Sequence, residues 1–214
     1  MLDSPLHPEP PYAALIFDCD GTLLDTAAAN ESAWRTALEK WDIELDSGWY
    51  RARTGLPADA LMTELAAKIG REFDRAAVRA AALDTYSRLV GTVEPHEPVA
   101  AVARAHHGRV PMAVASGGSR RGVEEGLRAT GLRPLFDAVV TRDDVRYGKP
   151  APDVYVLAAE RLEVDPAHCV AYEDSDEGAA AALVAGMRVI DVRPALGRVI
   201  SPVTSGSGAK SVKR

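Results

Sequence analysis

Cysteine is scarce in this chain, long apolar runs are missing, and basic residues do not predominate. The 214 residues include only two cysteines, Cys19 and Cys169, which are too few for a disulfide framework and do not stand in a metal-ligand spacing. No apolar stretch approaches the roughly 20 residues that a membrane-spanning helix needs, so we expect no membrane association. A formal net charge of -6 offers no broad positive field to nucleic acid, which we therefore do not expect as a partner.

The N-terminus also lacks the signals of secretion. The opening MLDSPLHPEPPYAALIF carries no positively charged leading segment and no cleavage-like ending after its short apolar run. Together with the low cysteine content, this favours a reducing cytoplasm as the location. The composition, 47% hydrophobic and 26% charged, is that of an ordinary globular protein, and we expect a monomer by default.

Strand-like and helix-like segments alternate along most of the chain. Short apolar runs predict strands at residues 12–17, 110–116, 136–141, 169–173 and 187–192. Segments with helical periodicity lie between the later runs, at residues 119–131, 152–163 and 176–186. Strand, helix and strand in repetition predict an α/β fold with a doubly wound parallel sheet, covered by helices on both faces.

One long interval interrupts this alternation. More than 90 residues separate the first two predicted strands, and most of them read as helix, at residues 27–41, 57–70, 73–90 and 97–107. We therefore predict a small helical cap, residues 26–93, inserted into an α/β core of residues 1–25 and 94–200. Within the cap, Trp34, Leu38 and Trp41 follow helical spacing and should share one face. The polar end of the chain, residues 201–214, is expected to be disordered.

Polar residues follow four of the predicted strands. They are Asp18 and Asp20 after the first, Ser116 and Gly117 after the second, Lys149 in the loop after the third, and Glu173 and Asp174 at the fourth. Because ligands gather beyond the carboxyl ends of the strands in an open parallel sheet, we expect these groups to meet. They supply carboxylates for a divalent cation, and a hydroxyl, backbone amides and an ammonium for a phosphate.

The acidic residues suit magnesium and a reactive carboxylate. Mg²⁺ prefers oxygen ligands and usually takes one or two carboxylates together with a substrate phosphate, a role that fits Asp18 and Asp174. Without a cation, their like charges would oppose each other. With the cation, Asp18 can stay ionised beside a phosphorus atom and attack it in line, which gives an aspartyl-phosphate intermediate.

The second aspartate is suited to proton transfer. Asp20 follows Asp18 by two residues, and Gly21 and Thr22 allow the backbone to turn at that point. The Asp20 carboxyl can then protonate the leaving alkoxide as a general acid and later activate water as a general base. The groups that would hold the other phosphate oxygens are Ser116, Lys149 and the amides around Gly21, Thr22 and Gly117.

Four segments together resemble a known family. In chain order, FDCDGTLLD, VASGGS, GKPAPDVY and YEDSDEG are similar to the four motifs of the haloacid dehalogenase superfamily of phosphohydrolases. The likeness runs from about Tyr12 to Val192. It is greatest to the branch of β-phosphoglucomutase and small sugar-phosphate phosphatases, in which a helical cap follows the first motif. An aspartate pair alone would be a weak signal, but four motifs in order are a strong one.

The resemblance implies a role for each motif residue. It implies Asp18 as nucleophile, Asp20 as acid and base, and Ser116 and Lys149 as phosphate ligands. For the cofactor Mg²⁺ it implies Asp18, Asp174 and the backbone carbonyl of Asp20 as ligands, with Glu173 assisting directly or through water.

Departures from the mutase pattern bear on the substrate. Asn30 stands where the mutase has a histidine, and Ala82 and Ala58 stand nearest its cap lysine and arginine. A mutase must hold the second phosphate of a bisphosphate, so the loss of these groups favours hydrolysis over isomerisation. The cap residues that we expect to contribute to specificity are Asn30, Arg53, Thr54 and Gly55.

These observations predict a Mg²⁺-dependent phosphatase of small phosphorylated metabolites, namely sugar or polyol phosphates, similar to phosphatases of fructose 1-phosphate. A phosphosugar mutase of the same fold is the alternative. A non-catalytic phosphometabolite-binding module fits less well, because all the catalytic groups are present. A dehalogenase also fits poorly, since that chemistry uses no metal and needs no acid at Asp20.

Overall fold

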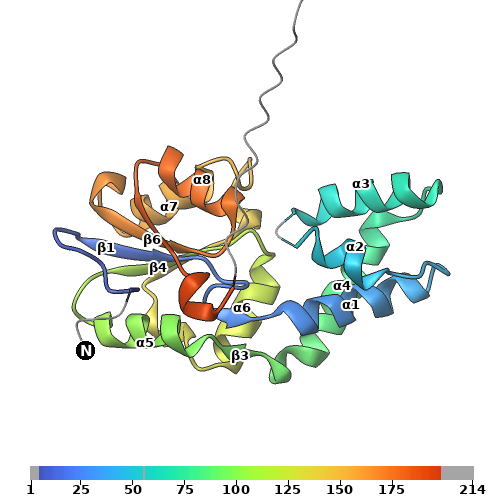
Figure 1. The fold of residues 1–214 in the computed structure, drawn as a ribbon, viewed down its shortest axis with the longest axis horizontal. Coiled ribbons are helices and arrows are strands. Elements are labelled where there is room, and N and C mark those ends of the chain that lie inside the picture. The colour runs from blue at the N-terminus through green and yellow to red at the C-terminus, as the bar shows by residue number, and fades with distance from the viewer. Residues whose placement is uncertain (1–4, 55, 199–214) are drawn as a thin grey trace, which may run out of the picture.

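A central sheet of five parallel strands organises the structure (Figure 1). The computed structural model describes residues 5–54 and 56–198, so the expected disorder of residues 201–214 lies outside the described residues. The strand order is β5-β4-β1-β6-β7. The strands are β1 (Ala14–Phe17), β4 (Met112–Ala115), β5 (Ala138–Val140), β6 (Cys169–Glu173) and β7 (Arg188–Asp191). Each lies within a segment that the sequence predicts to be a strand.

Helices cover both faces of this sheet (Figure 1). Helices α5 (Glu97–His106) and α6 (Arg120–Ala129) pack on one face, and α7 (Asp153–Arg161) and α8 (Asp176–Val184) on the other. The side chains of β1 alternate between these layers, because Leu15 and Phe17 belong to one apolar cluster and Ala14 and Ile16 to the other. A strand buried on both faces is apolar throughout. The predicted doubly wound α/β fold is confirmed.

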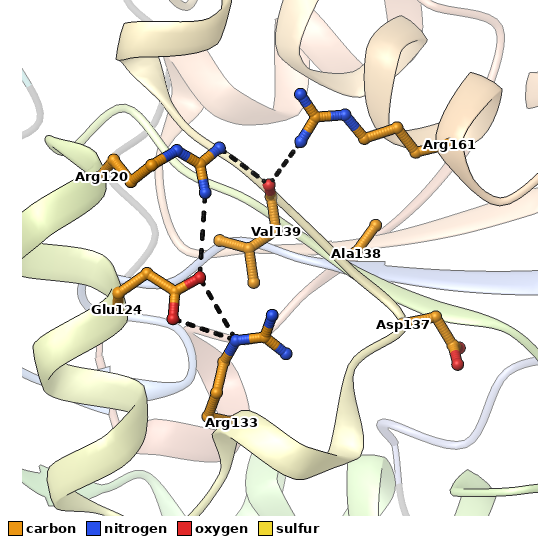
Figure 2. Close-up of a pocket in the computed structure, with 7 residues that line it drawn as sticks. All are labelled: Arg120, Glu124, Arg133, Asp137, Ala138, Val139 and Arg161. Carbon is orange, nitrogen blue, oxygen red and sulfur yellow. Dashed lines mark hydrogen bonds and ion pairs between the residues drawn. The ribbon is translucent and has the colours of Figure 1, made fainter.

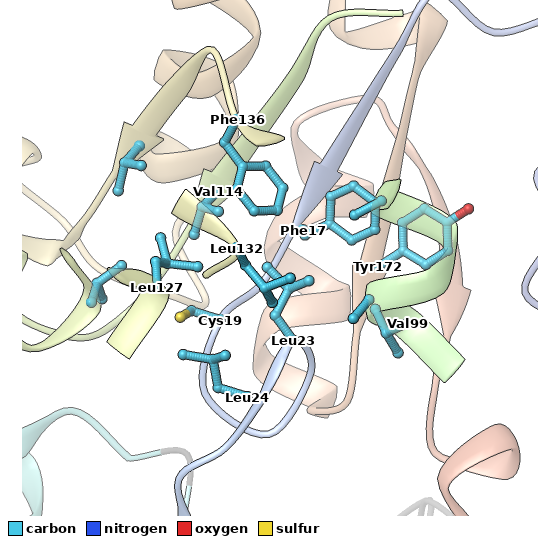
Figure 3. Packing of buried hydrophobic residues seen from close by; sticks show 14 of the residues in the cluster. Phe17, Cys19, Leu23, Leu24, Val99, Val114, Leu127, Leu132, Phe136 and Tyr172 are labelled. Atoms are coloured by element: carbon cyan, nitrogen blue, oxygen red, sulfur yellow. The ribbon is translucent and has the colours of Figure 1, made fainter. Parts of the chain in front are cut away.

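An aromatic core lies beneath the loop that follows β1 (Figure 3). Phe17 stacks on Tyr172 with 4.6 Å between the ring centroids and meets Phe136 edge-on at 5.8 Å. Cys19 belongs to the same cluster and is 1% exposed, so it is a packed thiol. Because Cys19 points into this core, the aspartates on either side of it are free to point toward the carboxyl edge of the sheet.

The long insertion is closed by a short ribbon. Strands β2 (Leu24–Asp25) and β3 (Glu94–Pro95) pair antiparallel and bring its two ends together. Between them lie α1 (Ala27–Glu39), α2 (Ser47–Arg51), α3 (Ala58–Ile69) and α4 (Arg75–Leu89), which we call the helical cap. The cap extends to one side of the sheet in Figure 1. The sequence pattern does not predict α2 or the ribbon, since elements of five and two residues are too short to show a period.

The cap has an apolar core of its own. Its members include Leu38, Tyr50, Leu61 and Val78, one from each cap helix. Trp34 and Trp41 pack against this core as predicted, although α1 ends at Glu39 and Trp41 lies beyond it. Ala82 is also part of it and is 5% exposed. Ala82 therefore faces the inside of the cap. The presence of alanine here is no evidence that a phosphate-binding lysine has been lost.

Short 3-10 turns complete the described chain, at Val90–Thr92, Arg133–Leu135, Arg142–Asp144, Pro166–His168 and Pro194–Leu196. Within the described ranges, no helix combines the length and apolar character that crossing a membrane would require.

Candidate active site

Three acidic side chains meet at the carboxyl ends of β1 and β6. Oxygen atoms of Asp18, Glu173 and Asp174 lie within 4.8 Å of one another. The two strands are neighbours with Phe17 opposite Tyr172, so the residues that follow them emerge at the same edge of the sheet. Asp18 is 7% exposed and Glu173 only 1%. The structure thus brings together three of the four predicted metal-binding residues through their side chains.

Lys149 lies among these carboxylates. Its Nζ is 2.6 Å from Asp18 Oδ1 and 2.6 Å from Glu173 Oε1, and 4.9 Å from the centroid of the Tyr155 ring. Lys149 comes from the loop between β5 and α7, as the predicted arrangement of strand ends requires. Because a buried charge must be paired, the ammonium and the two carboxylates form one unit.

Glu173 is held more tightly than its two acidic neighbours. Its Oε1 accepts hydrogen bonds from Lys149 and, at 2.7 Å, from the Tyr155 hydroxyl. Its Oε2 accepts from the Asp174 amide and from the amide and hydroxyl of Ser175, at 3.0–3.2 Å. Ser175 is the N-cap of α8. These donors occupy most of the carboxylate lone pairs, which favours an indirect role for Glu173 at a metal.

Asp174 is held from two sides. The Thr22 hydroxyl donates to Asp174 Oδ1 at 2.9 Å, and the Arg198 guanidinium donates to Oδ2 at 2.9 Å. Arg198 was not among the predicted site residues, because it lies beyond the last motif and has no spacing relation to the motif residues. The Thr22 side chain therefore donates its hydrogen bond to the Asp174 carboxylate in this structure.

Asp20 lies apart from the acidic cluster and faces the end of β4. Its Oδ2 is 3.5 Å from Ser116 Oγ, which also accepts a hydrogen bond from the Gly118 amide at 2.9 Å. Ser116 is 1% exposed. Gly117 is exposed, and within the described residues a Cβ added there would meet nothing closer than 4 Å. A carboxyl, a hydroxyl and an accessible stretch of backbone therefore adjoin one another where β1 and β4 end.

The amides of the loop after β1 are used by the loop itself. Gly21 N donates to Leu24 O at 2.8 Å, and Thr22 N donates to Cys19 O at 3.3 Å. Gly21 has a φ of +86°, which glycine adopts without steric cost. In this tight turn, the Gly21 and Thr22 amides donate to the loop itself, and their use for phosphate stays a prediction.

Burial and like charges perturb ionisation at the site. Burial raises the pKa of Asp18 well above its ordinary value, against the opposing charge of Lys149. Burial and the charge of Glu173 also raise the pKa of Asp174, against the Thr22 hydrogen bond and Arg198. For Lys149, burial favours a lower pKa, but Asp18 and Glu173 outweigh it and raise the pKa. The raised pKa values of the two carboxyl groups reflect burial beside other acidic groups, an unfavourable arrangement that a bound cation would relieve.

Among the described residues, the cap residues predicted for specificity make no hydrogen bond or ion pair with the acidic cluster. The Arg53 guanidinium pairs with Glu64 at 2.7 Å and lies 4.4 Å from the centroid of the Trp49 ring. Thr54 is exposed and donates to a backbone carbonyl of the cap, and Gly55 lies outside the described residues. Asn30 is half-buried on α1, and among the described residues its side chain makes no hydrogen bond that links it to the site.

Tyrosines near the site were not anticipated, and Tyr155 and Tyr50 are examples. Tyr155 donates to Glu173 and belongs to the GKPAPDVY segment, so its place in that motif was an available signal. Tyr50 of α2 is 6% exposed, and burial with the charges of Asp20 and Glu31 raises its pKa. The Tyr50 hydroxyl therefore lies in the field of Asp20. Only the fold of the cap reveals this, because no motif includes Tyr50.

A separate hollow lies beside β5, at an edge of the sheet (Figure 2). Arg120 and Arg161 both donate to Val139 O, and Arg133 pairs with Glu124 at 3.0 Å. Arg120 and Arg161 also pair with Asp144. Since each of these arginines already has a carboxylate partner, the hollow has little charge to offer a phosphate, and the acidic cluster remains the candidate site.

The start of α8 leaves no room for a side chain at Gly178. A Cβ there would lie 1.8 Å from Glu173 Oε1. Gly178→Ala should displace Glu173 and lower the free energy of unfolding by about 1–3 kcal/mol, although alanine favours helix more than glycine does. Urea denaturation measures the loss, with Gly91→Ala as the control because a Cβ at Gly91 meets no described atom within 4 Å. Equal stability of the two variants would contradict this account.

Comparison with known proteins agrees with the geometry of the site. A family model described as a haloacid dehalogenase-like hydrolase matches residues 12–186. The fructose-1-phosphate phosphatase YqaB of Escherichia coli strain K12 is 40% identical over 183 residues, which cover 85% of this chain and 97% of that protein. The β-phosphoglucomutase of Bacillus subtilis strain 168 is 29% identical over 196 residues, 86% of each chain.

A solved structure shows the same fold. The crystal structure of CbbY from Rhodobacter sphaeroides in complex with phosphate has a TM-score of 0.73 and 28% identity, over 84% of this chain and 85% of that one. The match to the family model spans Asp18, Ser116, Lys149 and Asp174, the residues that the fold gathers at the carboxyl edge of the sheet. The chain therefore belongs to the haloacid dehalogenase-like hydrolase family.

Proposed function

We propose that this protein is a Mg²⁺-dependent phosphatase of small phosphorylated metabolites, with sugar or polyol phosphates as its substrate class. One observation carries the proposal: Asp18 shares a buried site with Asp174 and Lys149, while Asp20 lies beside Ser116. A nucleophile, a proton donor and phosphate ligands are thus available at one edge of the sheet. The similarity to a fructose-1-phosphate phosphatase supports the choice of sugar phosphates.

The donor set fits a small hard cation. Three carboxylates offer oxygen atoms within 4.8 Å of one another, and Mg²⁺ prefers oxygen ligands. Among the described residues, two cations, Lys149 and Arg198, pair with the acidic residues of the site. With all four of these acidic residues ionised, one divalent ion would neutralise the remaining charge. We propose Asp18, Asp174 and the Asp20 carbonyl as ligands, with Glu173 acting through water. The bound ion would supply charge stabilisation to the phosphate.

The residues of this chain can then divide the reaction between them. Lys149 holds Oδ1 of Asp18, so the other oxygen is available to form a bond to phosphorus as the bond to the alkoxide breaks. Asp20 protonates the departing alkoxide and later takes a proton from the water that hydrolyses the aspartyl-phosphate. This second step releases inorganic phosphate and regenerates Asp18. Ser116, Gly117 and Lys149 hold the oxygens that do not react.

A substrate panel tests the proposal. Phosphorylated sugars, polyols, glycolate and nucleotides are incubated with the protein and Mg²⁺, and inorganic phosphate is measured. We expect the fastest release from a sugar or polyol phosphate. Binding across the panel without turnover would instead support a phosphometabolite-binding module.

A phosphosugar mutase is the second candidate, favoured by the similarity to a β-phosphoglucomutase. The place of Ala82 inside the cap core also removes one argument against it. The mutase would convert a sugar 1-phosphate to a 6-phosphate in the presence of a bisphosphate activator and release little phosphate. Chromatography of the products separates the two reactions, and isomer as the main product would overturn the phosphatase.

Mg²⁺ should stabilise this protein more at pH 8 than at pH 5. The native pKa values of Asp18 and Asp174 lie above their ordinary values, so the native state keeps protons that the unfolded state releases from about pH 4 upward. In the metal-free protein, their contribution to stability therefore falls as the pH rises through the raised pKa values.

Mg²⁺ binds the ionised form of the carboxylates, so its binding should offset the fall in stability at high pH. Urea denaturation with and without Mg²⁺ at each pH measures the gain, and Asp174→Asn should remove the pH dependence of that gain. An equal gain at both pH values in the wild-type protein would contradict the assignment of these carboxylates to the metal.

A further inference from the structure

Arg198 joins three parts of the molecule beside the acidic cluster. Its Nη1 donates to Asp174 Oδ2 at 2.9 Å and to the Gly21 carbonyl at 3.0 Å, and its Nη2 lies 3.1 Å from His96 Nε2. Asp174 follows β6, Gly21 lies in the loop after β1, and His96 follows β3, where the chain returns from the cap. One guanidinium therefore ties the loops that follow two core strands to the ribbon at the base of the cap.

These contacts fix the orientation of the Asp174 carboxylate. Arg198 holds Oδ2 and Thr22 holds Oδ1, so the group cannot rotate without losing a hydrogen bond, yet each oxygen keeps a second lone pair for a cation. The loop after β1 also approaches closely, because a Cβ at Gly21 would lie 2.3 Å from Asp174 Oδ2. Without the guanidinium, repulsion from Glu173 and Asp18 would favour rotation of Asp174 away from the cluster.

We propose that Arg198 is a positioning residue for the cation site, which holds Asp174 and the loop after β1 at the separation that a divalent ion requires. The inference rests on the proposed function, since it concerns the metal of that reaction. Arg198 acts through Asp174 and the Gly21 carbonyl and takes no part in the chemical steps.

A positive charge beside a cation site has a second possible effect, which is to repel the ion. The two effects predict opposite results. If repulsion dominates, Arg198→Gln binds the metal more tightly and Arg198→Lys leaves binding unchanged. If positioning dominates, both variants bind more weakly, because a lysine ammonium lacks the planar fork that contacts Asp174 and Gly21 with one nitrogen and His96 with the other. Positioning should prevail because the Arg198 side chain is 36% exposed, and solvent screens its charge more than its hydrogen bonds.

Calorimetric titration of the full chain with Mn²⁺ and with Mg²⁺, in the absence of substrate, tests the proposal. We expect the dissociation constant to rise about 10- to 100-fold in Arg198→Gln and in Arg198→Lys, as for other residues that orient metal ligands. Arg193→Gln is the matched control. Arg193 lies shortly before Arg198 in the chain and pairs with Asp191 and Asp176. Arg193→Gln therefore removes ion pairs from the same part of the chain, but no contact with Asp174 or Gly21.

Each outcome of the titration supports or overturns the positioning role of Arg198. Unchanged or tighter binding in either Arg198 variant would overturn the inference, and so would an equal loss of affinity in Arg193→Gln. If Asp174→Asn abolishes binding while the Arg198 variants keep it, only the inference fails. If the wild-type protein binds neither ion, the proposed metal site fails, and the role of Arg198 with it.

Discussion

Asp18→Asn should abolish phosphate release from the best substrate, with a loss of activity on the order of 10⁴-fold or more. The amide matches the carboxylate in shape but lacks the negative oxygen that attacks phosphorus. Stability should not fall with activity. Burial and the charges of Glu173 and Asp174 already oppose the ionisation of Asp18, so removing its charge should leave the metal-free protein at least as stable in urea.

The matched control for this variant is Asp176→Asn. Asp176 is an exposed carboxylate at the start of α8 and pairs with Arg193, so its loss should leave activity close to that of the wild-type protein. Asp18→Asn with more than a tenth of the wild-type activity would overturn the covalent mechanism. A parallel collapse of activity and stability would point to misfolding, and an acid-quench search for phosphorylated wild-type protein then tests the same intermediate without any variant.

Lys149→Met should have the largest effect on stability. The side chains of Asp18 and Glu173 are 9% and 1% exposed and share the Lys149 ammonium. Removing one partner of a buried charge cluster leaves the others uncompensated, at a cost of about 3–5 kcal/mol. Urea denaturation of the metal-free protein at pH 8 measures this cost. Activity should fall as well, because the phosphate loses a preorganised cation.

A second substitution separates the two effects of Lys149. Adding Glu173→Gln to Lys149→Met removes one of the stranded charges, so part of the lost stability should return while activity stays low. Lys40→Met provides the control, since Lys40 is exposed beyond the end of α1. A loss below about 1 kcal/mol in Lys149→Met would mean that the ammonium is not what neutralises the buried carboxylates.

The core of the fold could be predicted because the hydrophobic pattern of each segment matches the burial of that segment in the folded protein. Strand β6 is buried along its whole length and reads as an apolar run, and α6 has a charged face and an apolar face that differ clearly along the sequence. The polar residues at the ends of the strands could also be recognised in the sequence. The topology of a parallel sheet then requires that those ends lie at one edge, which is why Asp18, Lys149 and the two acidic residues at the end of β6 meet.

Several features depended on contacts between distant segments. The two-residue strands of the ribbon exist because the ends of the cap are adjacent, and Ala82 turns inward because α4 packs on α1. The amides of Gly21 and Thr22 are used by their own turn, which residue types alone do not show. Arg53 likewise carries the right charge for a substrate phosphate but is engaged by Glu64 and Trp49.

By itself, the sequence determined the class of fold, the order of strands and helices in the α/β core, and the set of acidic, hydroxyl and ammonium groups available for phosphate chemistry, because each depends on residue type and short-range spacing. Only the tertiary structure decided how those groups are paired: Lys149 between two carboxylates, Glu173 at the start of α8, and Arg198 on Asp174. The physical reason is that the energy of a buried charge depends on partners brought within hydrogen-bond distance by the fold, and those partners lie far apart along the chain.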